Sequence, residues 1–366
     1  MLKIKAAVNY GPKTPYQIED VELADPRGDE VLVKIVASGI CHTDEFGKGI
    51  GLPTPLVLGH EGAGIIEKLG DSVQGFEVGD HVLFSFATCG HCKNCISGMP
   101  AYCESFNQIN FGGIGADGKT KLFKDGKPVS MFFGQSSFAQ YSVITSRNIV
   151  KVDKDLDLAI LAPFGCGIQT GAGAVLNAID PDCTDSIAIF GCGAVGMSAI
   201  MAAKVAGCRQ IVAVGGNAKS LELAKELGAT HTVNRKLLEE GQSIAAAVQE
   251  ISGGGVNYAI DTSGNGNMIS NAVKSTAYHG TIVVLAPTGS IENFNVGADI
   301  LMMTRTLKAC YEGDSIPQIF IPKLVQLYKE GKFPVDKIIK TYDFADIVQA
   351  ESDSASGKVI KAVVRM

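Results

Sequence analysis

The middle of the chain alternates short apolar segments with segments of helical periodicity, and this alternation restricts the possible folds more than any other feature. The expected strands are residues 186–190, 211–214, 258–261 and 281–285. The expected helices include residues 195–206 and 220–227, the second of which ends at Gly228. Strands that alternate with helices form parallel sheets, so the sequence predicts an α/β fold with a doubly wound sheet.

The first part of the chain has a different, β-rich pattern. Expected strands lie at residues 3–8, 30–38 and 81–84, while the last part carries a helix near 322–329 and a strand at 358–364. A chain of 366 residues is long enough for two domains. We expect a doubly wound dinucleotide-binding domain at residues 168–308, and a mainly β domain formed by residues 1–167 with 309–366.

Composition and charge exclude several classes of protein. The net charge is −6 and no long run of Lys or Arg is present, so nucleic acid is not an expected partner. The sequence shows no unbroken apolar stretch of membrane-spanning length and no signal peptide in Met1–Gly11, which favours a cytoplasmic protein without a membrane partner. Four of the ten cysteines fall within fifteen residues, and this clustering favours metal binding over disulfide bonds.

The clustered cysteines have the spacing C-x2-C-x2-C-x7-C. They are Cys89, Cys92, Cys95 and Cys103. Short loops between thiolates produce the tetrahedral geometry that zinc prefers, and four protein ligands leave no open coordination position. The spacing therefore predicts a structural zinc site. The alternative is four unrelated thiols in a loop.

A second candidate metal site is spread along the chain. Cys41 begins the segment Cys-His-Thr-Asp, His60 lies in Gly-His-Glu-Gly-Ala-Gly, and Cys166 stands between two glycines. A single Cys or His is more often a packed side chain than a ligand. Two thiolates, one imidazole and one water nevertheless form a known catalytic zinc set, so these three residues are candidate ligands.

The segment from Gly191 to Gly196 has the pattern G-x-G-x-x-G, with glycines at 191, 193 and 196. The pattern alone is weak, but here it follows an expected strand and opens an expected helix. That context is typical of a dinucleotide-binding turn, in which the pyrophosphate faces a helix N-terminus.

The end of the second expected strand lacks an acidic residue. NAD-binding domains place a carboxylate there to hold the adenosine ribose, but this sequence continues with Gly215, Gly216 and Asn217. Without that carboxylate a 2′-phosphate is not repelled, and Asn217 and Lys219, taken as the only nearby cation, could contact it. We therefore expect NAD(P) with a preference for NADP; dual specificity is the alternative.

Taken together, these motifs resemble the zinc-containing medium-chain alcohol dehydrogenases, in the same order and over nearly the whole chain. Residues 165–174 and 135–139 are particularly similar to the bacterial benzyl alcohol (aryl-alcohol) branch. The resemblance implies a GroES-like catalytic domain beside a Rossmann-type domain. It also implies reversible oxidation of aromatic or allylic primary alcohols to aldehydes, by hydride transfer to NAD(P) with zinc as the Lewis acid.

The resemblance also implies roles for individual residues. Cys41, His60 and Cys166 would bind a catalytic zinc, in addition to the structural one, giving two zinc ions per subunit. Asp44 would orient His60, Glu61 would lie behind the metal, and Thr43 would take the proton of the alcohol. The implied cofactor contacts are His42 and Lys361 on the pyrophosphate, and the implied substrate contacts are Phe86 and Phe132.

Two departures and two alternatives stay open at this point. Besides the missing acid at Gly215, Phe46 stands where related enzymes carry a proton-relay His. A glutathione-dependent formaldehyde dehydrogenase would need a basic anion site, which the sequence does not reveal. A non-catalytic zinc-binding module would need neither the second zinc set nor the nucleotide turn. The resemblance further favours a homo-oligomer, with a tetramer preferred over a dimer.

Overall fold

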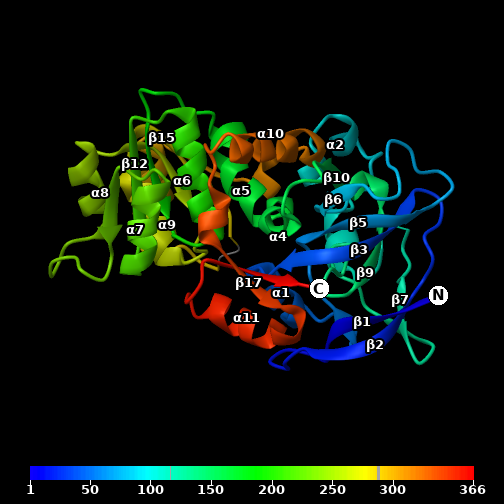
Figure 1. Ribbon diagram of the computed structural model, residues 1–366. Helices are drawn as coiled ribbons and strands as arrows, with labels where there is room; N and C mark the ends of the chain where they lie inside the picture. Colours follow the sequence, from blue (N-terminus) through cyan, green and yellow to red (C-terminus); the bar gives the residue numbers. More distant parts are fainter. Residues whose placement is uncertain (116, 287–288) are drawn as a thin grey trace. The chain divides into compact units, whose positions relative to one another are not determined.

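The computed structural model describes residues 1–115, 117–286 and 289–366. The chain forms two compact units (Figure 1). The first unit comprises Met1–Gly167, Ser315–Gln326 and Val335–Met366, and the second comprises Ile168–Asp314 and Leu327–Pro334.

The second unit contains one sheet of six parallel strands. Its strands are β11 (Ser186–Phe190), β12 (Gln210–Gly215), β13 (His231–Asn234), β14 (Val256–Asp261), β15 (Thr276–Val284) and β16 (Thr306–Ala309). They are ordered β13-β12-β11-β14-β15-β16, and every neighbouring pair is parallel. This is the 3-2-1-4-5-6 order of a dinucleotide-binding sheet, and it confirms the α/β fold expected from the sequence.

The helices of the second unit pack on that sheet in two pairs. They are α6 (Ala194–Ala206), α7 (Ala218–Leu227), α8 (Ile244–Ser252) and α9 (Gly266–Ser275). Helix α6 packs against α7, and α8 packs against α9. Buried aliphatic side chains from the strands and from α8 and α9 form one core, which includes Val212, Val248 and Ile282. A rigid sheet of this kind holds the loops at the carboxyl ends of its strands in fixed positions.

The first unit is mainly β, as expected. One sheet has the order β4-β1-β2-β7-β8; a second has the order β10-β6-β5-β3-β18-β17, with β9 also paired to β3. The strands are β1 (Leu2–Asn9), β2 (Gln17–Leu23), β3 (Glu30–Gly39), β4 (Leu56–Val57), β5 (Gly62–Leu69), β6 (His81–Phe84), β7 (Leu122–Lys124), β8 (Lys127–Val129), β9 (Tyr141–Thr145), β10 (Ile149–Val152), β17 (Ile339–Asp343) and β18 (Lys361–Arg365). The α-helices that begin in this unit are α1 (His42–Gly49), α2 (Lys93–Ile96), α3 (Phe106–Phe111), α4 (Leu158–Leu161), α5 (Gly167–Gly173), α10 (Pro317–Lys329) and α11 (Ile347–Ala355).

The expected domain limits differ from the units in the last third of the chain. Residues 309–314 belong to the second unit, because β16 is paired to β15 and the carbonyl oxygen of Gly313 accepts a hydrogen bond from Asn177 Nδ2 at 2.9 Å. Residues 327–334 also belong to it, so α10 begins in one unit and ends in the other. The expectation that residues 309–366 form one continuous part of the β domain was wrong.

Two element boundaries near the C-terminus also differ from those expected. Helix α10 begins at Pro317 and contains Pro322, where the sequence suggested a beginning. Strand β18 begins at Lys361, three residues later than the expected strand. In the described ranges no single helix is long and apolar enough to cross a membrane, although the bent pair 158–165 and 167–179 meets those criteria by length and composition.

Candidate active site

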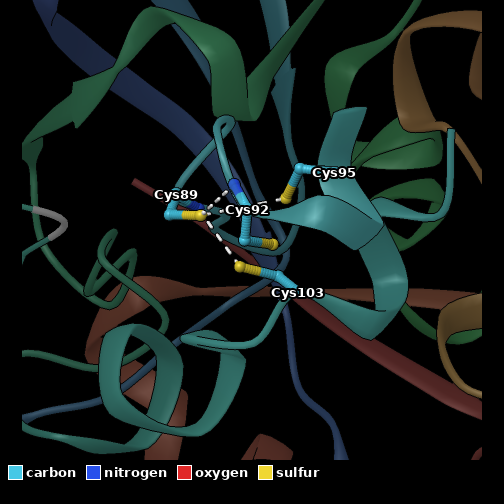
Figure 2. Close-up of side chains that lie close together, drawn as sticks. All are labelled: Cys89, Cys92, Cys95 and Cys103. Carbon is cyan, nitrogen blue, oxygen red and sulfur yellow. Dashed lines mark hydrogen bonds between the residues drawn. The ribbon is translucent and has the colours of Figure 1, made fainter. Parts of the chain in front are cut away.

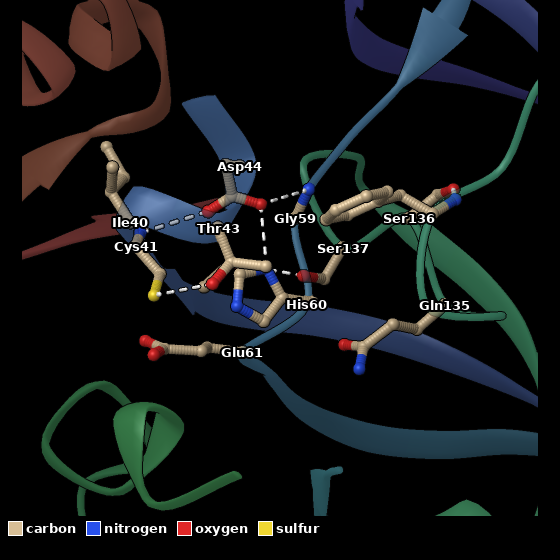
Figure 3. Close-up of polar contacts among 12 residues, drawn as sticks. Ile40, Cys41, Thr43, Asp44, Gly59, His60, Glu61, Gln135, Ser136 and Ser137 are labelled. Atoms are coloured by element: carbon tan, nitrogen blue, oxygen red, sulfur yellow. Dashed lines mark hydrogen bonds and ion pairs between the residues drawn. The ribbon is translucent and has the colours of Figure 1, made fainter. Parts of the chain in front are cut away.

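Four potential metal ligands from distant parts of the first unit meet at one point. Cys41 follows β3, His60 and Glu61 precede β5, and Cys166 follows a short helical turn at Ala162–Gly165. Their ligand atoms all lie within 4.8 Å of one another. The structure thus brings together the three ligands proposed from the sequence and adds the carboxylate of Glu61. Figure 3 shows Cys41, His60 and Glu61 around a common space.

Asp44 fixes the orientation of the His60 imidazole. Helix α1 places this carboxylate in its first turn, fully buried, with Oδ1 2.8 Å from His60 Nδ1 (Figure 3). The same oxygen accepts a hydrogen bond from Gly59 N–H at 3.1 Å, and Oδ2 accepts one from Cys41 N–H at 3.0 Å. An ionised carboxylate can only accept, so Nδ1 of the imidazole carries a proton and Nε2 faces the thiols.

His60 Nε2 is the most informative atom of the site. It is buried and has no hydrogen-bond partner among the described residues. A buried polar atom without a partner costs roughly 1–3 kcal/mol, so native structures rarely leave one unpaired. A cation bound by Nε2 and the thiols of Cys41 and Cys166 removes this cost, and nitrogen and sulfur are the ligand atoms that zinc prefers. The residues present therefore fit a zinc ion.

The charges of the group also suit a cation. Hydrogen bonding with Cys166 holds the pKa of Cys41 well below its usual value; burial opposes this, but His60 and Lys361 add to it. Burial acts to lower the pKa of His60, yet the charge and hydrogen bond of Asp44, together with Cys41, raise it well above its usual value. Burial raises the pKa of Glu61 to about 7. Because zinc requires a neutral imidazole, its binding would release the His60 proton.

Lys361 lies beside this group. Its buried ammonium donates to the carbonyl oxygen of Ile40 at 3.0 Å and forms a 2.5 Å ion pair with Glu61. Glu61 also accepts a hydrogen bond from Gly167 N–H at 3.3 Å. A Cβ atom at Gly39 would lie 1.9 Å from Glu61 Oε2, so only glycine leaves room for this carboxylate. The expected contact between Lys361 and a pyrophosphate stays a prediction.

The other residues of the Cys-His-Thr-Asp segment lie at the start of α1. The Cys41 thiol faces Thr43 Oγ1 at a distance of 3.7 Å, so the Thr43 hydroxyl lies next to the candidate metal ligands. His42 is the first residue of α1 and its side chain is exposed. Its expected contact with the cofactor also stays a prediction.

The four clustered cysteines converge in the loop around α2 (Figure 2). The sulfurs of Cys89, Cys92, Cys95 and Cys103 all lie within 4.8 Å of one another. The Sγ atoms of Cys89 and Cys95 are 4.0 Å apart. This is close to the sulfur–sulfur separation of about 3.8 Å that tetrahedral Zn–S bonds of ~2.3 Å require.

Backbone N–H groups already point at these sulfurs. Cys103 Sγ accepts from Cys89 N–H at 3.3 Å, and Cys89 Sγ accepts from Cys92 N–H at 3.3 Å. Backbone hydrogen bonds from Cys95 and Glu104 lower the pKa of Cys92 to about 6. These donors stabilise thiolates, so this loop fits zinc as well.

The G-x-G-x-x-G segment forms the turn between β11 and α6. Gly191 has a φ of +109°, a conformation that side chains disfavour. A Cβ atom at Gly196 would lie 1.9 Å from the carbonyl oxygen of Gly191, whereas one at Gly193 would meet nothing within 4 Å. Gly193 caps α6 without a side-chain hydrogen bond, so the first N–H groups of the helix stay available. The turn therefore fits a pyrophosphate approaching the backbone.

The expected ribose-binding residues lie at the carboxyl end of β12. Gly215 is the last residue of the strand, and a Cβ atom there would lie 3.1 Å from Cys192 Sγ and 3.2 Å from Leu221. Asn217 caps α7, because its Oδ1 accepts from Lys219 N–H at 3.0 Å. The Lys219 side chain is exposed.

Two cations near this turn were missed by the sequence analysis. A Cβ atom at Gly216 would lie 3.1 Å from Arg235 Nε and 3.3 Å from Lys236 Cε. The expectation that Lys219 is the only nearby cation was therefore wrong. The strand order of a doubly wound sheet could have predicted their position. Strand β13 lies beside β12 with Asn234 opposite Gly215, so the residue after β13 lies at the same edge of the sheet as the end of β12.

Aromatic side chains surround the His60 imidazole. The rings of Phe132 and Phe133 lie 5.7 Å and 4.7 Å from it. Phe111 continues the cluster at 5.1 Å from Phe133, and Phe46 lies 5.9 Å from Phe111 and is 51% exposed. Phe132 therefore lies beside the candidate metal ligands, and its expected contact with a substrate stays a prediction.

The second expected substrate contact, Phe86, is linked to the His60 imidazole through two other rings. It packs on Phe106 at 5.7 Å, and Phe106 in turn lies 6.3 Å from Phe133. Neither Phe111 nor Phe133 was expected at the site from the sequence. The adjacent aromatic residues Phe132 and Phe133 are the sequence feature that could have predicted this aromatic cluster.

A Rossmann sheet, a GroES-like β unit and a Cys/His group of this kind define the zinc-dependent alcohol dehydrogenases, and comparison with known proteins agrees. Residues 27–154 match the family model described as "Alcohol dehydrogenase GroES-like domain", and residues 194–330 match "Zinc-binding dehydrogenase". The chain belongs to this family, in its medium-chain form.

Individual relatives extend over the whole chain. Geraniol dehydrogenase of Castellaniella defragrans is 41% identical over 99% of this chain and 98% of its own length. The crystal structure of benzyl alcohol dehydrogenase from Acinetobacter calcoaceticus superposes with a TM-score of 0.94 at 42% identity, covering 100% of both chains. An alcohol dehydrogenase zinc-binding domain protein from Burkholderia ambifaria gives a TM-score of 0.95 at 44% identity, covering 100% of this chain and 99% of that one.

Proposed function

We propose that this alcohol dehydrogenase oxidises aromatic and allylic primary alcohols, such as benzyl alcohol and geraniol, to aldehydes with NAD(P). The observation that carries the proposal is the buried, unpartnered His60 Nε2 among two thiols and an aromatic cluster. The relatives named for geraniol and benzyl alcohol support the substrate class. This combination of metal ligands and aromatic rings does not support the alternative of a non-catalytic zinc-binding module.

Cys41, His60 and Cys166 would hold a catalytic zinc, and the four clustered cysteines would hold a structural one. When bound, zinc supplies a Lewis acid that lowers the pKa of the alcohol, and the nicotinamide cofactor supplies the hydride acceptor. Three protein ligands leave a coordination position open, whereas four do not. Glu61 has its carboxylate engaged by Lys361 and Gly167, which keeps it from the role of a permanent ligand.

Proton removal falls to Thr43 in this proposal. Its hydroxyl lies 3.7 Å from Cys41 Sγ, next to the ligand group, and can pass a proton onward because it both donates and accepts. Phe46 is exposed and packs on Phe111, so it offers apolar surface where related enzymes carry a relay His. We infer that the proton leaves through the cofactor ribose and water instead.

The aromatic cluster gives the preference for aromatic and allylic alcohols its physical basis. Flat apolar rings bury more substrate surface than a methyl group can. An additional ~80–100 Å² of apolar contact at ~25 cal/mol per Å² is worth about 2 kcal/mol, or roughly thirtyfold in specificity.

A panel of alcohols tests the proposal. We expect kcat/KM for benzyl alcohol and geraniol to exceed that for ethanol by about thirtyfold, with either cofactor. Equal values for ethanol and benzyl alcohol would contradict the substrate class. Oxidation of formaldehyde that depends on glutathione, without oxidation of benzyl alcohol, would instead favour the glutathione-dependent alternative. The tetrameric state and the cytoplasmic location stay predictions from the sequence.

A further inference from the structure

The carboxyl edge of the parallel sheet carries a pair of cations without an assigned role. Arg235 directly follows β13, and its backbone N–H donates to the carbonyl oxygen of Gly215 at 2.9 Å. This bond ties Arg235 to the end of β12, where a dinucleotide-binding sheet receives the adenosine ribose. Arg235 and Lys236 are both exposed, so a ligand can reach them.

The side chains of these cations are directed toward that edge. Arg235 Nε and Lys236 Cε lie 3.1 Å and 3.3 Å from the position that a Cβ atom of Gly216 would occupy. Glycine at 216 therefore leaves the space in which the guanidinium rests. A larger residue would displace it.

The described residues offer neither cation an ion-pair partner. In the part of the chain that the structure describes, no carboxylate lies within 4.0 Å of the Arg235 guanidinium or the Lys236 ammonium. The adjacent strand also ends in Gly215 instead of a carboxylate. The end of β12 thus has Arg235 and Lys236 beside it and no carboxylate of its own, the reverse of what a ribose with free hydroxyls prefers.

We propose that Arg235, assisted by Lys236, binds the adenosine 2′-phosphate of NADP and sets the cofactor preference of this protein. The inference rests on the proposed function in one respect, namely that a dinucleotide binds at the Gly191–Gly196 turn. A guanidinium presents paired N–H donors that match two phosphate oxygens, and Lys236 adds a second charge. Asn217 has its Oδ1 engaged in capping α7, and Lys219 lies on the same exposed turn as a weaker contributor.

Nucleotide fragments test the inference without any turnover. Adenosine 2′,5′-bisphosphate and 5′-AMP are titrated separately into the zinc-loaded protein in a calorimeter. We expect the bisphosphate to bind at least about tenfold more tightly to the wild type. Arg235→Gln should weaken bisphosphate binding by roughly ten- to a hundredfold and leave 5′-AMP within about twofold. Lys236→Gln should have a smaller effect in the same direction.

Arg209→Gln is the matched control. Arg209 is an exposed arginine that precedes β12 at the opposite end of the strand, so its loss should change neither titration. Equal wild-type affinity for the two nucleotides, or an unchanged bisphosphate affinity in Arg235→Gln, would overturn the inference. Gly215→Asp is a less suitable variant, because its Cβ would crowd Cys192 Sγ at 3.1 Å.

Measurements of turnover distinguish a failure of this inference from a failure of the proposed function. Arg235→Gln should raise KM for NADP by the factor seen in the titrations, and kcat/KM for NAD should change far less. A wild type that oxidises no alcohol with either cofactor would refute the proposed function. The difference between the two titrations would still decide the role of Arg235.

Discussion

At the residue scale, the candidate active site depends on a carboxylate whose two oxygens are both engaged. Asp44 receives the N–H groups of Gly59 and Cys41 and faces His60 Nδ1, and each contact involves a donor. The imidazole is thereby held with Nε2 toward the thiols before any metal binds. Such outer contacts typically contribute 10–100-fold to metal affinity or activity.

Replacing this carboxylate by an amide tests that arrangement. In Asp44→Asn, the amide NH2 must face either the Cys41 N–H or the Gly59 N–H and His60, so at least one donor faces another donor. We expect roughly a 10–100-fold loss in kcat or zinc affinity. Steady-state kinetics and zinc titration measure the effect, and Asp71→Asn at an exposed position is the control. Unchanged values for Asp44→Asn would contradict the orienting role.

Cys166 is the ligand whose loss should affect chemistry alone. It lies outside the four-cysteine loop, and Ser is close to Cys in volume but a poor zinc ligand. We expect Cys166→Ser to lower kcat by more than about a hundredfold, since even the loss of a group that only orients a ligand reaches that level. Circular dichroism should show an unchanged fold, and Cys183→Ser, which alters an exposed thiol, should retain full activity. Wild-type turnover in Cys166→Ser would remove Cys166 from the site.

At the scale of elements, the four-cysteine loop is a closed unit whose own backbone donates to its sulfurs. Helix α2 has only four residues and no buried side chain, so apolar packing contributes little to it. A segment of this kind depends on its metal for folding.

Removal of one sulfur from this loop should therefore destabilise the protein. We expect Cys95→Ser to cost at least about 4 kcal/mol, as losses of a structural metal do. At roughly 2–4 °C per kcal/mol the melting temperature should fall by on the order of 10 °C. Calorimetry measures it, with Ser97→Ala at an exposed position of the same loop as control. A sharp fall in turnover at constant melting temperature would instead give this metal a catalytic role.

Elements were predictable from the sequence where one local pattern decides them. Strand β11 and strand β6 have the expected limits, because apolar runs end at Gly191 and at the polar Ser85. The start of α10 was missed, since Pro322 is a usual first residue of a helix but here lies inside one. Arg235 was missed because it lies next to Gly216 at the end of the neighbouring strand. The contact between the two residues depends on the order and register of β12 and β13.

At the scale of the whole molecule, the two candidate metal sites share no residue and use different sets of ligand atoms. One uses four thiols from a single loop, and the other joins residues from three segments of the first unit. Each would therefore take up and lose its ion separately.

Zinc content provides the corresponding test. We expect two zinc ions per wild-type chain, one in Cys166→Ser and at most one in Cys95→Ser, measured by mass spectrometry of the elements. A chelator should first remove the ion from the three-ligand group, because its open position admits competing ligands. Loss of both ions in one step would show that the two groups are coupled.

The ion pair between Lys361 and Glu61 has a consequence for the order of events during synthesis. The four cysteines follow each other closely, so a nascent chain can close that loop soon after Cys103 leaves the ribosome. The surroundings of His60 are completed later, because Glu61 acquires its counter-charge only when β18 arrives with Lys361. Translation therefore imposes an order, in which the four-cysteine loop can bind zinc before Lys361 has been synthesised and Glu61 gains its counter-charge only afterwards.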